Sequence, residues 1–168
     1  MDKLKVTKDL ENKTLTLERN FAAPVEKLWR AYSDKEWFTK WWGPQGWETT
    51  VKEFDFTPGG RNLYGMRCVD QNQGDFFGQE SWGLMEYKTI DEPRGFTYKD
   101  FFANPDGSKQ ENMPGVSIEV ELQGNTEGTT LVTRCIGETA EDIEKLVAMG
   151  MLEGFNSSAD KLEALVTA

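Results

Sequence analysis

The sequence predicts an α+β fold in which a curved antiparallel sheet of six to seven strands wraps around one long C-terminal helix, with two short helices after the first strand. Three features predict it: an amphipathic segment over residues 139–166, a series of alternating apolar segments joined by polar turns, and two short helical segments near the N-terminus. No repeat, linker or low-complexity segment divides the 168 residues. We therefore expect a single domain over residues 1–168, with residues 1–12 as an N-terminal extension of the first strand.

The C-terminal segment has the periodicity of one long helix. At 100° per residue its apolar side chains form a single stripe, and Thr139 followed by Asp142 resembles a capping box at its start. Gly150, Gly154 and Ser158 recur at steps of four within this stripe. Each interior glycine costs about 0.5–1 kcal/mol relative to alanine. The small residues therefore either admit another element closely or leave room for a ligand between helix and sheet.

The first strand and the two short helices follow from the N-terminal third of the chain. Residues 15–21 alternate, with Leu15, Leu17, Arg19 and Phe21 on one face. Pro24 then opens a short helix, because proline is tolerated in a first turn. The segment 33–36 reads Ser-Asp-Lys-Glu, a capping box that predicts a second helix carrying Trp37, Phe38 and Trp41.

The middle of the chain predicts the remaining strands. The sequence Thr57-Pro58-Gly59-Gly60 is typical of a type II turn, and residues 70–74 and 104–115 are polar connections. Between the turns the expected strands are residues 47–56, 61–68, 82–88, 96–102, 116–122 and 129–136.

Composition and charge narrow the function classes. The net charge of −10 argues against affinity for nucleic acid or an anionic membrane, and no apolar run is long enough for a membrane span or a signal peptide. We therefore expect a cytoplasmic protein whose Cys68 and Cys135 are reduced. The absence of histidine excludes Ser-His-Asp and Cys-His catalysis within this chain and His-ligated zinc. No cofactor or metal is expected, and an enzyme is less favoured than a binding protein.

Several motifs together carry a resemblance to a known family. The motifs are Arg19, Ala23-Pro24, Trp29, Trp41-Trp42-Gly43-Pro44, the run from Phe54 to Gly60, Gly83 with Glu86, Pro93-Arg94, and Gly154-Phe155 before Leu162. This order resembles the bacterial homologues of the heat-shock protein 90 ATPase activator. That family belongs to the START-like, polyketide-cyclase-related (SRPBCC) helix-grip superfamily. The resemblance covers about residues 15–166, and Gly154-Phe155 stands where the family usually has Gly-Trp.

The resemblance implies a hydrophobic cavity between the long helix and the curved sheet. Aromatic side chains and methionine suit its wall because they offer large, polarizable surfaces. The candidate ligand-binding residues are Trp41, Trp42, Phe54, Tyr64, Met66, Trp82, Met85, Phe101, Ile118, Met151, Gly154 and Phe155. Each of them can equally belong to the plain core. Asp55, Glu80 and Tyr98 are the candidate polar groups of the cavity, although Asp55 can equally cap its own turn.

Three functions remain open on the sequence. The first is a binding or carrier domain for a small hydrophobic or aromatic molecule. The second, implied by the resemblance, is a co-chaperone linked to the stress response that acts on a heat-shock protein 90 homologue. The separate N-terminal domain of the full-length activators is not expected in this chain. The third is a cyclase- or hydrolase-type enzyme using buried carboxylates. The chain is expected to be a monomer or a homodimer.

Overall fold

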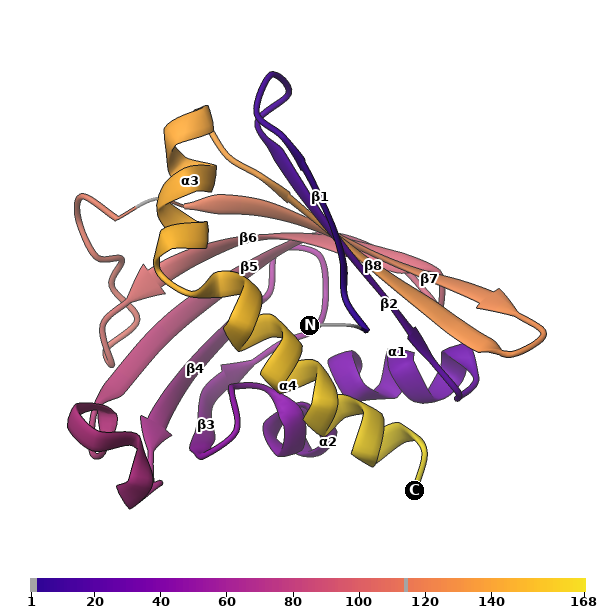
Figure 1. The fold of residues 1–168 in the computed structure, drawn as a ribbon, viewed down its shortest axis with the longest axis horizontal. Coiled ribbons are helices and arrows are strands. Elements are labelled where there is room, and N and C mark those ends of the chain that lie inside the picture. The colour runs from indigo at the N-terminus through magenta and orange to yellow at the C-terminus, as the bar shows by residue number, and fades with distance from the viewer. Residues whose placement is uncertain (1–2, 114) are drawn as a thin grey trace.

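The chain folds into one antiparallel sheet with helices on one side of it (Figure 1). The computed structural model describes residues 3–113 and 115–168. Met1, Asp2 and Pro114, which belong to the predicted N-terminal extension and to the predicted 104–115 connection, lie outside the described residues. The sheet has eight strands in the order β1-β2-β8-β7-β6-β5-β4-β3. The strands are β1 Lys5–Asp9, β2 Thr14–Phe21, β3 Trp47–Phe54, β4 Arg61–Cys68, β5 Glu80–Asp91, β6 Gly95–Ala103, β7 Val116–Asn125 and β8 Gly128–Ile136.

The strand count differs from the expected six to seven because the N-terminal segment is not an extension of the first strand. Residues 5–9 form β1, which pairs antiparallel with β2 from Lys5 opposite Glu18 to Asp9 opposite Thr14. The connection turns back sharply, with Lys13 at a φ of 58° and its N–H bonded to the Leu10 carbonyl at 3.2 Å. Residues 10–13 therefore form a hairpin turn, and β1 is an edge strand of the sheet.

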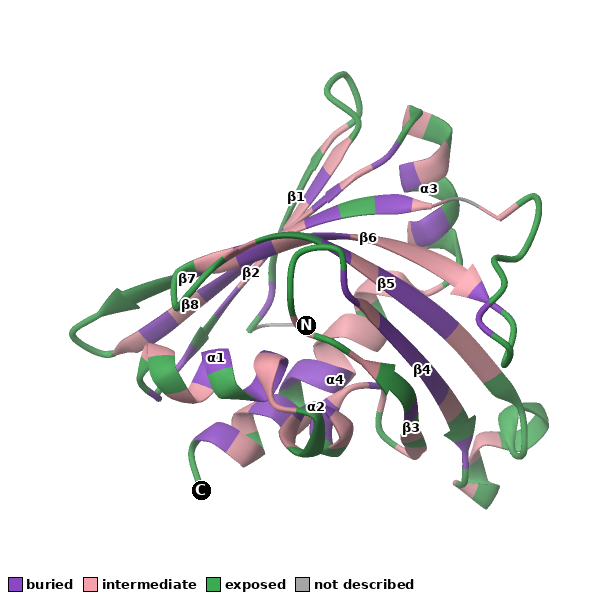
Figure 2. Cartoon of the chain, turned by 180° about the vertical axis from the view of Figure 1, so that it is seen from behind, coloured by how far each residue is buried: buried purple, intermediate pink, exposed green. Residues whose placement is uncertain are grey.

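The two faces of the sheet differ in burial, as alternation predicts. In β2 the side chains of Leu15, Leu17, Arg19 and Phe21 are buried, which is the predicted face. In β7 Val116, Ile118, Val120 and Leu122 are buried between exposed or half-buried neighbours. Figure 2 shows buried segments along the strands where the helices gather. The core therefore lies between this face and the helices.

Two short helices follow β2, as predicted: α1 Val25–Ser33 and α2 Lys35–Trp41. Pro24 is the N-cap of α1. The cap of α2 is Asp34 rather than the predicted Ser33, because the Asp34 carboxylate accepts hydrogen bonds from the backbone N–H groups of Glu36 at 2.9 Å and Trp37 at 3.3 Å.

The C-terminal segment is two helices rather than the single one expected. Helix α3 spans Ala140–Ala148 and begins at the predicted cap, where the Thr139 side chain accepts from Asp142 N–H at 3.1 Å. Helix α4 spans Met151–Val166. Between them Gly150 adopts a φ of 89°, which turns the chain because glycine carries no Cβ to oppose a left-handed backbone. Gly150 is therefore the break in the helix and not part of a helical row of small residues.

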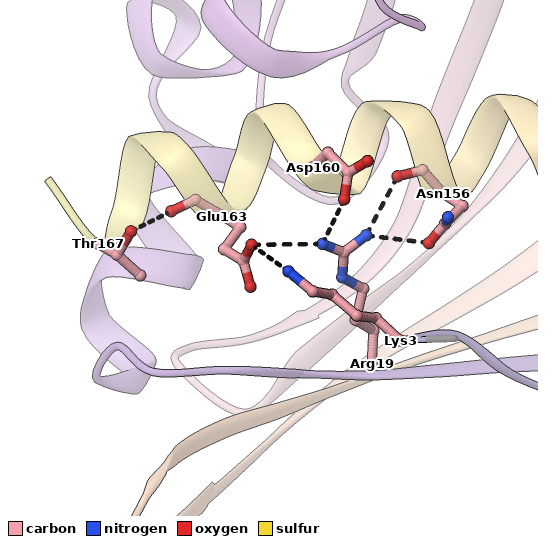
Figure 3. A network of polar contacts seen from close by, with 6 residues as sticks. All are labelled: Lys3, Arg19, Asn156, Asp160, Glu163 and Thr167. Carbon is pink, nitrogen blue, oxygen red and sulfur yellow. Dashed lines mark hydrogen bonds and ion pairs between the residues drawn. The ribbon is translucent and has the colours of Figure 1, made fainter. Parts of the chain in front are cut away.

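Helix α4 is held to β2 by the buried side chain of Arg19 (Figure 3). Its guanidinium donates to the Asn156 backbone carbonyl at 3.1 Å and Asn156 Oδ1 at 3.0 Å, and to Asp160 Oδ1 at 2.7 Å. Glu163 adds a carboxylate oxygen at 3.7 Å. These charge-assisted bonds fix the position of α4 over the sheet.

No helix in residues 3–113 and 115–168 has both the length and the apolar character that crossing a bilayer requires.

Candidate functional site

Two adjoining cavities lie between the C-terminal helices and the sheet. Their volumes are about 330 Å³ and about 280 Å³. Tyr64, Met66, Asp100 and Met151 line both cavities, so the two meet along a shared wall. Protein sites for small organic molecules usually measure about 300–1,000 Å³, which places each cavity near the lower end of this range.

The first cavity lies under the break between α3 and α4. Leu146, Met149, Gly150 and Met151 form its helical side, while β4, β5, β6 and the start of β7 form the opposite side. The strand residues on this wall are Tyr64, Met66, Ser81, Trp82, Gly83, Asp100, Phe101, Phe102 and Val116. The turn at Gly150 therefore shapes this cavity, which a continuous helix would not do.

The second cavity lies between α4 and the end of α2. Gly154, Phe155 and Ser158 line it from α4, and Trp41 and Trp42 line it from the α2 end. Across from them Tyr98, Ile118, Val120, Thr133 and Cys135 contribute from β6, β7 and β8. Its wall is thus mainly aromatic and aliphatic.

Hydrogen bonds and ring contacts fix the aromatic wall of the second cavity. The Trp41 indole N–H donates to the Ala31 carbonyl at 2.8 Å, and Ser158 Oγ donates to the Trp41 carbonyl at 2.9 Å. Trp42 stacks on Phe38 with ring centroids 4.9 Å apart and meets the Tyr64 ring edge to face at 5.6 Å. These contacts hold the Trp41 and Trp42 rings in position on the cavity wall.

Gly154 faces open space. A Cβ at this position would meet no atom within 4 Å among the described residues, apart from its chain neighbours and the local helix backbone. Of the two explanations for small residues in this helix, close approach of another element therefore does not apply at Gly154. Ser158, in contrast, faces the end of α2 through its hydrogen bond to Trp41.

Asp100 is the acidic residue of the shared wall. Tyr64 Oη donates to its carboxylate, at 3.2 Å from Oδ1 and 3.5 Å from Oδ2. Burial raises the pKa of Asp100 to about 7, and the hydrogen bonds from Tyr64 and from the Phe101 backbone only partly oppose this rise. Burial also raises the pKa of Tyr64 well above its usual value, and the neighbouring Asp100 charge adds to the rise. The pair can accept a donor group from a ligand and can exchange a proton near neutral pH.

Asp100 is not among the predicted site residues, although the alternation of β6 indicates its position. Strand β6 alternates, so Phe96, Tyr98 and Asp100 share one face, and the two aromatic residues are buried. An acidic residue in register with two buried aromatic ones is a candidate for an inward carboxyl group.

Most of the predicted site residues line one or both of the cavities. These are Trp41, Trp42, Tyr64, Met66, Trp82, Tyr98, Phe101, Ile118, Met151, Gly154 and Phe155. Their role in ligand binding stays a prediction. Phe54 and Met85 line neither cavity: Phe54 packs against Phe38 at 5.8 Å between centroids, and Met85 is buried beside Asn62 and Tyr87.

The predicted carboxylates Asp55 and Glu80 lie outside both cavities. Both side chains are exposed, and Asp55 Oδ1 accepts from the Thr57 hydroxyl at 2.8 Å within its own turn. In that turn Gly59 has a φ of 86° and the Gly60 N–H bonds to the Thr57 carbonyl at 2.8 Å, the expected type II geometry. The part of the chain that the structure describes holds no cluster of three or more potential metal ligands among Cys, Asp and Glu.

Comparisons with known proteins agree with this fold. The profile of the family described as "Activator of Hsp90 ATPase homolog 1-like protein" matches residues 22–167. The structure is similar to that of protein Ms6760 from Mycobacterium smegmatis, with 32% identity, a TM-score of 0.86, and coverage of 98% of this chain and 96% of that one. It is also similar to a protein from Staphylococcus epidermidis, with 28% identity, a TM-score of 0.81, and coverage of 97% and 93%. No curated protein matches the sequence significantly.

Proposed function

The chain belongs to the family of Activator of Hsp90 ATPase homolog 1-like proteins, and on this premise we propose that it binds or carries a small hydrophobic or aromatic molecule in its two cavities. In this proposal the domain is a helix-grip domain of the START-like type, and α4 is the helix that the sheet encloses. The observation that carries the proposal is the pair of adjoining cavities with mainly apolar walls. Gly154 lies on the wall of the second cavity and leaves the space beside it unfilled.

The chemistry of the wall supports an apolar, partly aromatic ligand. Trp41, Trp42 and Phe155 offer flat surfaces for stacking or edge-to-face contact. Met66 and Met151 lie on both cavities, and their flexible thioethers can adapt to ligands of irregular shape. Few polar groups interrupt this surface, which is the usual composition of a site for a small organic molecule.

Native mass spectrometry combined with a dye titration tests the proposal. The protein is measured as purified and after extraction with organic solvent, and the extracted protein is titrated with N-phenyl-1-naphthylamine, a neutral dye that fluoresces in apolar surroundings. We expect one dye per chain and competition by whatever molecule the extraction releases. An extracted, folded protein that takes up no dye contradicts the proposal.

A second candidate function is partnership with a heat-shock protein 90 homologue in the cytoplasm. The family description supports it, and the connection between β4 and β5 provides an apolar surface. There Val69, Phe76 and Phe77 are 43%, 58% and 49% exposed. If this surface meets the chaperone, the Phe76→Ser/Phe77→Ser variant loses the binding that the unmodified chain shows. An unmodified chain that neither binds the host chaperone nor changes its ATPase rate removes this candidate.

A further inference from the structure

The chemical class of the ligand follows from the polar groups on the cavity wall, and this inference rests on the proposed binding function. Asp100 stands out because its carboxyl group faces both cavities while it forms no ion pair among the described residues. A carboxylate offers about four lone-pair positions, of which the Tyr64 hydroxyl and the Phe101 backbone N–H use two. Acceptor capacity therefore remains for a ligand.

The groups around Asp100 bring no positive charge to the site. The ionisable side chains that interact with it are Tyr64 on β4, Tyr87 on β5, Tyr98 on β6 and Cys135 on β8. Burial raises the pKa of each of them, to about 12 for Cys135 and well above the usual value for Tyr64 and Tyr98. They all stay neutral between pH 5 and pH 9. On the helical side, α3, α4 and the turn between them contribute Leu146, Met149, Gly150, Met151, Gly154, Phe155 and Ser158, none of which is ionisable. Helices α1 and α2 contribute Tyr32 and Trp41, and burial raises the pKa of Tyr32 so that it too stays neutral.

A second polar group marks the second cavity. Thr133 on β8 is only 6% exposed and lines this cavity, and its hydroxyl oxygen has no hydrogen-bond partner within residues 3–113 and 115–168. Thr133 pairs with Val120 of β7, and Val120 pairs with Phe96 of β6. Phe96 lies four residues before Asp100 on β6. Four residues of strand correspond to about 13 Å. A buried hydroxyl without a partner costs free energy unless a ligand or water satisfies it. The apolar wall therefore carries polar groups well separated along the strands.

We propose that the ligand is a neutral or cationic aromatic molecule whose N–H or O–H group donates a hydrogen bond to Asp100, and that the cavity rejects carboxylates and other anions. The Asp100 carboxylate repels an anion, no cation of the wall compensates, and the net charge of −10 opposes the approach of an anion from outside. Fatty acids and other acidic lipids are thereby excluded despite their apolar chains.

Two dyes of almost the same shape test this proposal. N-phenyl-1-naphthylamine is neutral and has one N–H donor, while 8-anilino-1-naphthalenesulfonate carries the same rings and a permanent anion. Both are titrated into the full chain, into Asp100→Asn, and into Asp55→Asn, which removes an equal charge from an exposed position outside the cavities. Thermal unfolding of all three proteins shows that each is folded.

We expect the neutral dye to bind the unmodified protein and Asp55→Asn at least ten times more tightly than the anionic dye at pH 8. Ionised Asp100 repels the anionic dye, and protonation of Asp100 relieves this repulsion. At one pH unit above the pKa of Asp100 the affinity for the anionic dye is therefore about tenfold weaker. Asp100→Asn is expected to bind the anionic dye about tenfold more tightly than the unmodified protein at pH 8, and no more tightly at pH 6.

Each alternative outcome is informative. Equal affinity of the two dyes in the unmodified protein, or an equal gain in Asp55→Asn and Asp100→Asn, overturns the ligand class and leaves the binding function standing. If neither dye binds any of the folded proteins, the binding function fails and the ligand class fails with it.

Discussion

Substitutions at Gly154 test the stability of α4 and ligand binding in the cavity independently. Alanine at an interior helix position is favoured over glycine by about 0.5–1 kcal/mol, and a Cβ at Gly154 meets no neighbouring atom within 4 Å in the described chain. We therefore expect Gly154→Ala to raise the free energy of unfolding by that amount. For a chain of this length this corresponds to a rise in Tm of about 1–4 °C.

Gly154→Leu adds an isobutyl group to the wall of a cavity of about 280 Å³. Leucine is nearly as good a helix former as alanine, and the added carbons bury apolar surface in empty space. The variant is expected to be at least as stable as the unmodified protein, yet to bind N-phenyl-1-naphthylamine at least tenfold more weakly. Gly154→Ala serves as the matched control, with nearly unchanged affinity.

Urea unfolding and dye titration of the three proteins provide both readouts. A Gly154→Leu protein that unfolds at lower urea concentration than the unmodified protein would show that the space is not open. Undiminished dye affinity in a stable Gly154→Leu protein would show that the dye binds elsewhere, and the reasoning about this cavity would be refuted.

Three further predictions concern Asp100 and Tyr64 on the cavity wall and Arg19 between β2 and α4. The pKa of Asp100 is about 7 in the folded protein and ordinarily 3.8, so its ionisation lowers the free energy of unfolding as the pH rises between these values. Urea unfolding should therefore find Asp100→Asn more stable than the unmodified protein by on the order of 1–4 kcal/mol at pH 8 and no more stable near pH 4. Tyr64→Phe removes a hydrogen bond that lowers the pKa of Asp100, so this pKa should rise further, as carboxyl carbon NMR titration would show; an unchanged midpoint would contradict the pairing. Arg19→Ala should lower the free energy of unfolding by about 2–4 kcal/mol, because α4 loses its bonds to β2, while Lys5→Ala, which breaks only an exposed pair, should change it by less than about 1 kcal/mol.

The order of the elements could be predicted because local patterns determine it. Alternation placed Arg19 on the buried face of β2, and a Thr139 cap marked the start of α3. The break at Gly150 could not be predicted from periodicity, since the apolar stripe continues in phase across it. The sequence does not distinguish a glycine with a helical backbone from one with a left-handed backbone, and only packing against the sheet selects between the two conformations.

The site was harder to predict than the fold. The aromatic and methionine residues of the wall have the composition of a core, and nothing local distinguishes Trp42, which lines a cavity, from Phe54, which does not. Asp100 lies opposite Met85 on β5 and Val116 on β7, so its surroundings come from strands distant in the sequence. The position of α4 over the sheet likewise depends on a distant residue, Arg19 of β2, which is bonded to Asn156 and Asp160 (Figure 3).

The most direct test of the central claim is a crystal structure of the protein soaked with N-phenyl-1-naphthylamine. We expect density for the dye between α4 and the sheet, with the rings against Trp42 and Phe155 and the amine nitrogen about 2.7–3.2 Å from the Asp100 carboxylate. Density for the dye only on the outer surface, with Met151 and Phe155 packed into the space beside Gly154, would contradict it.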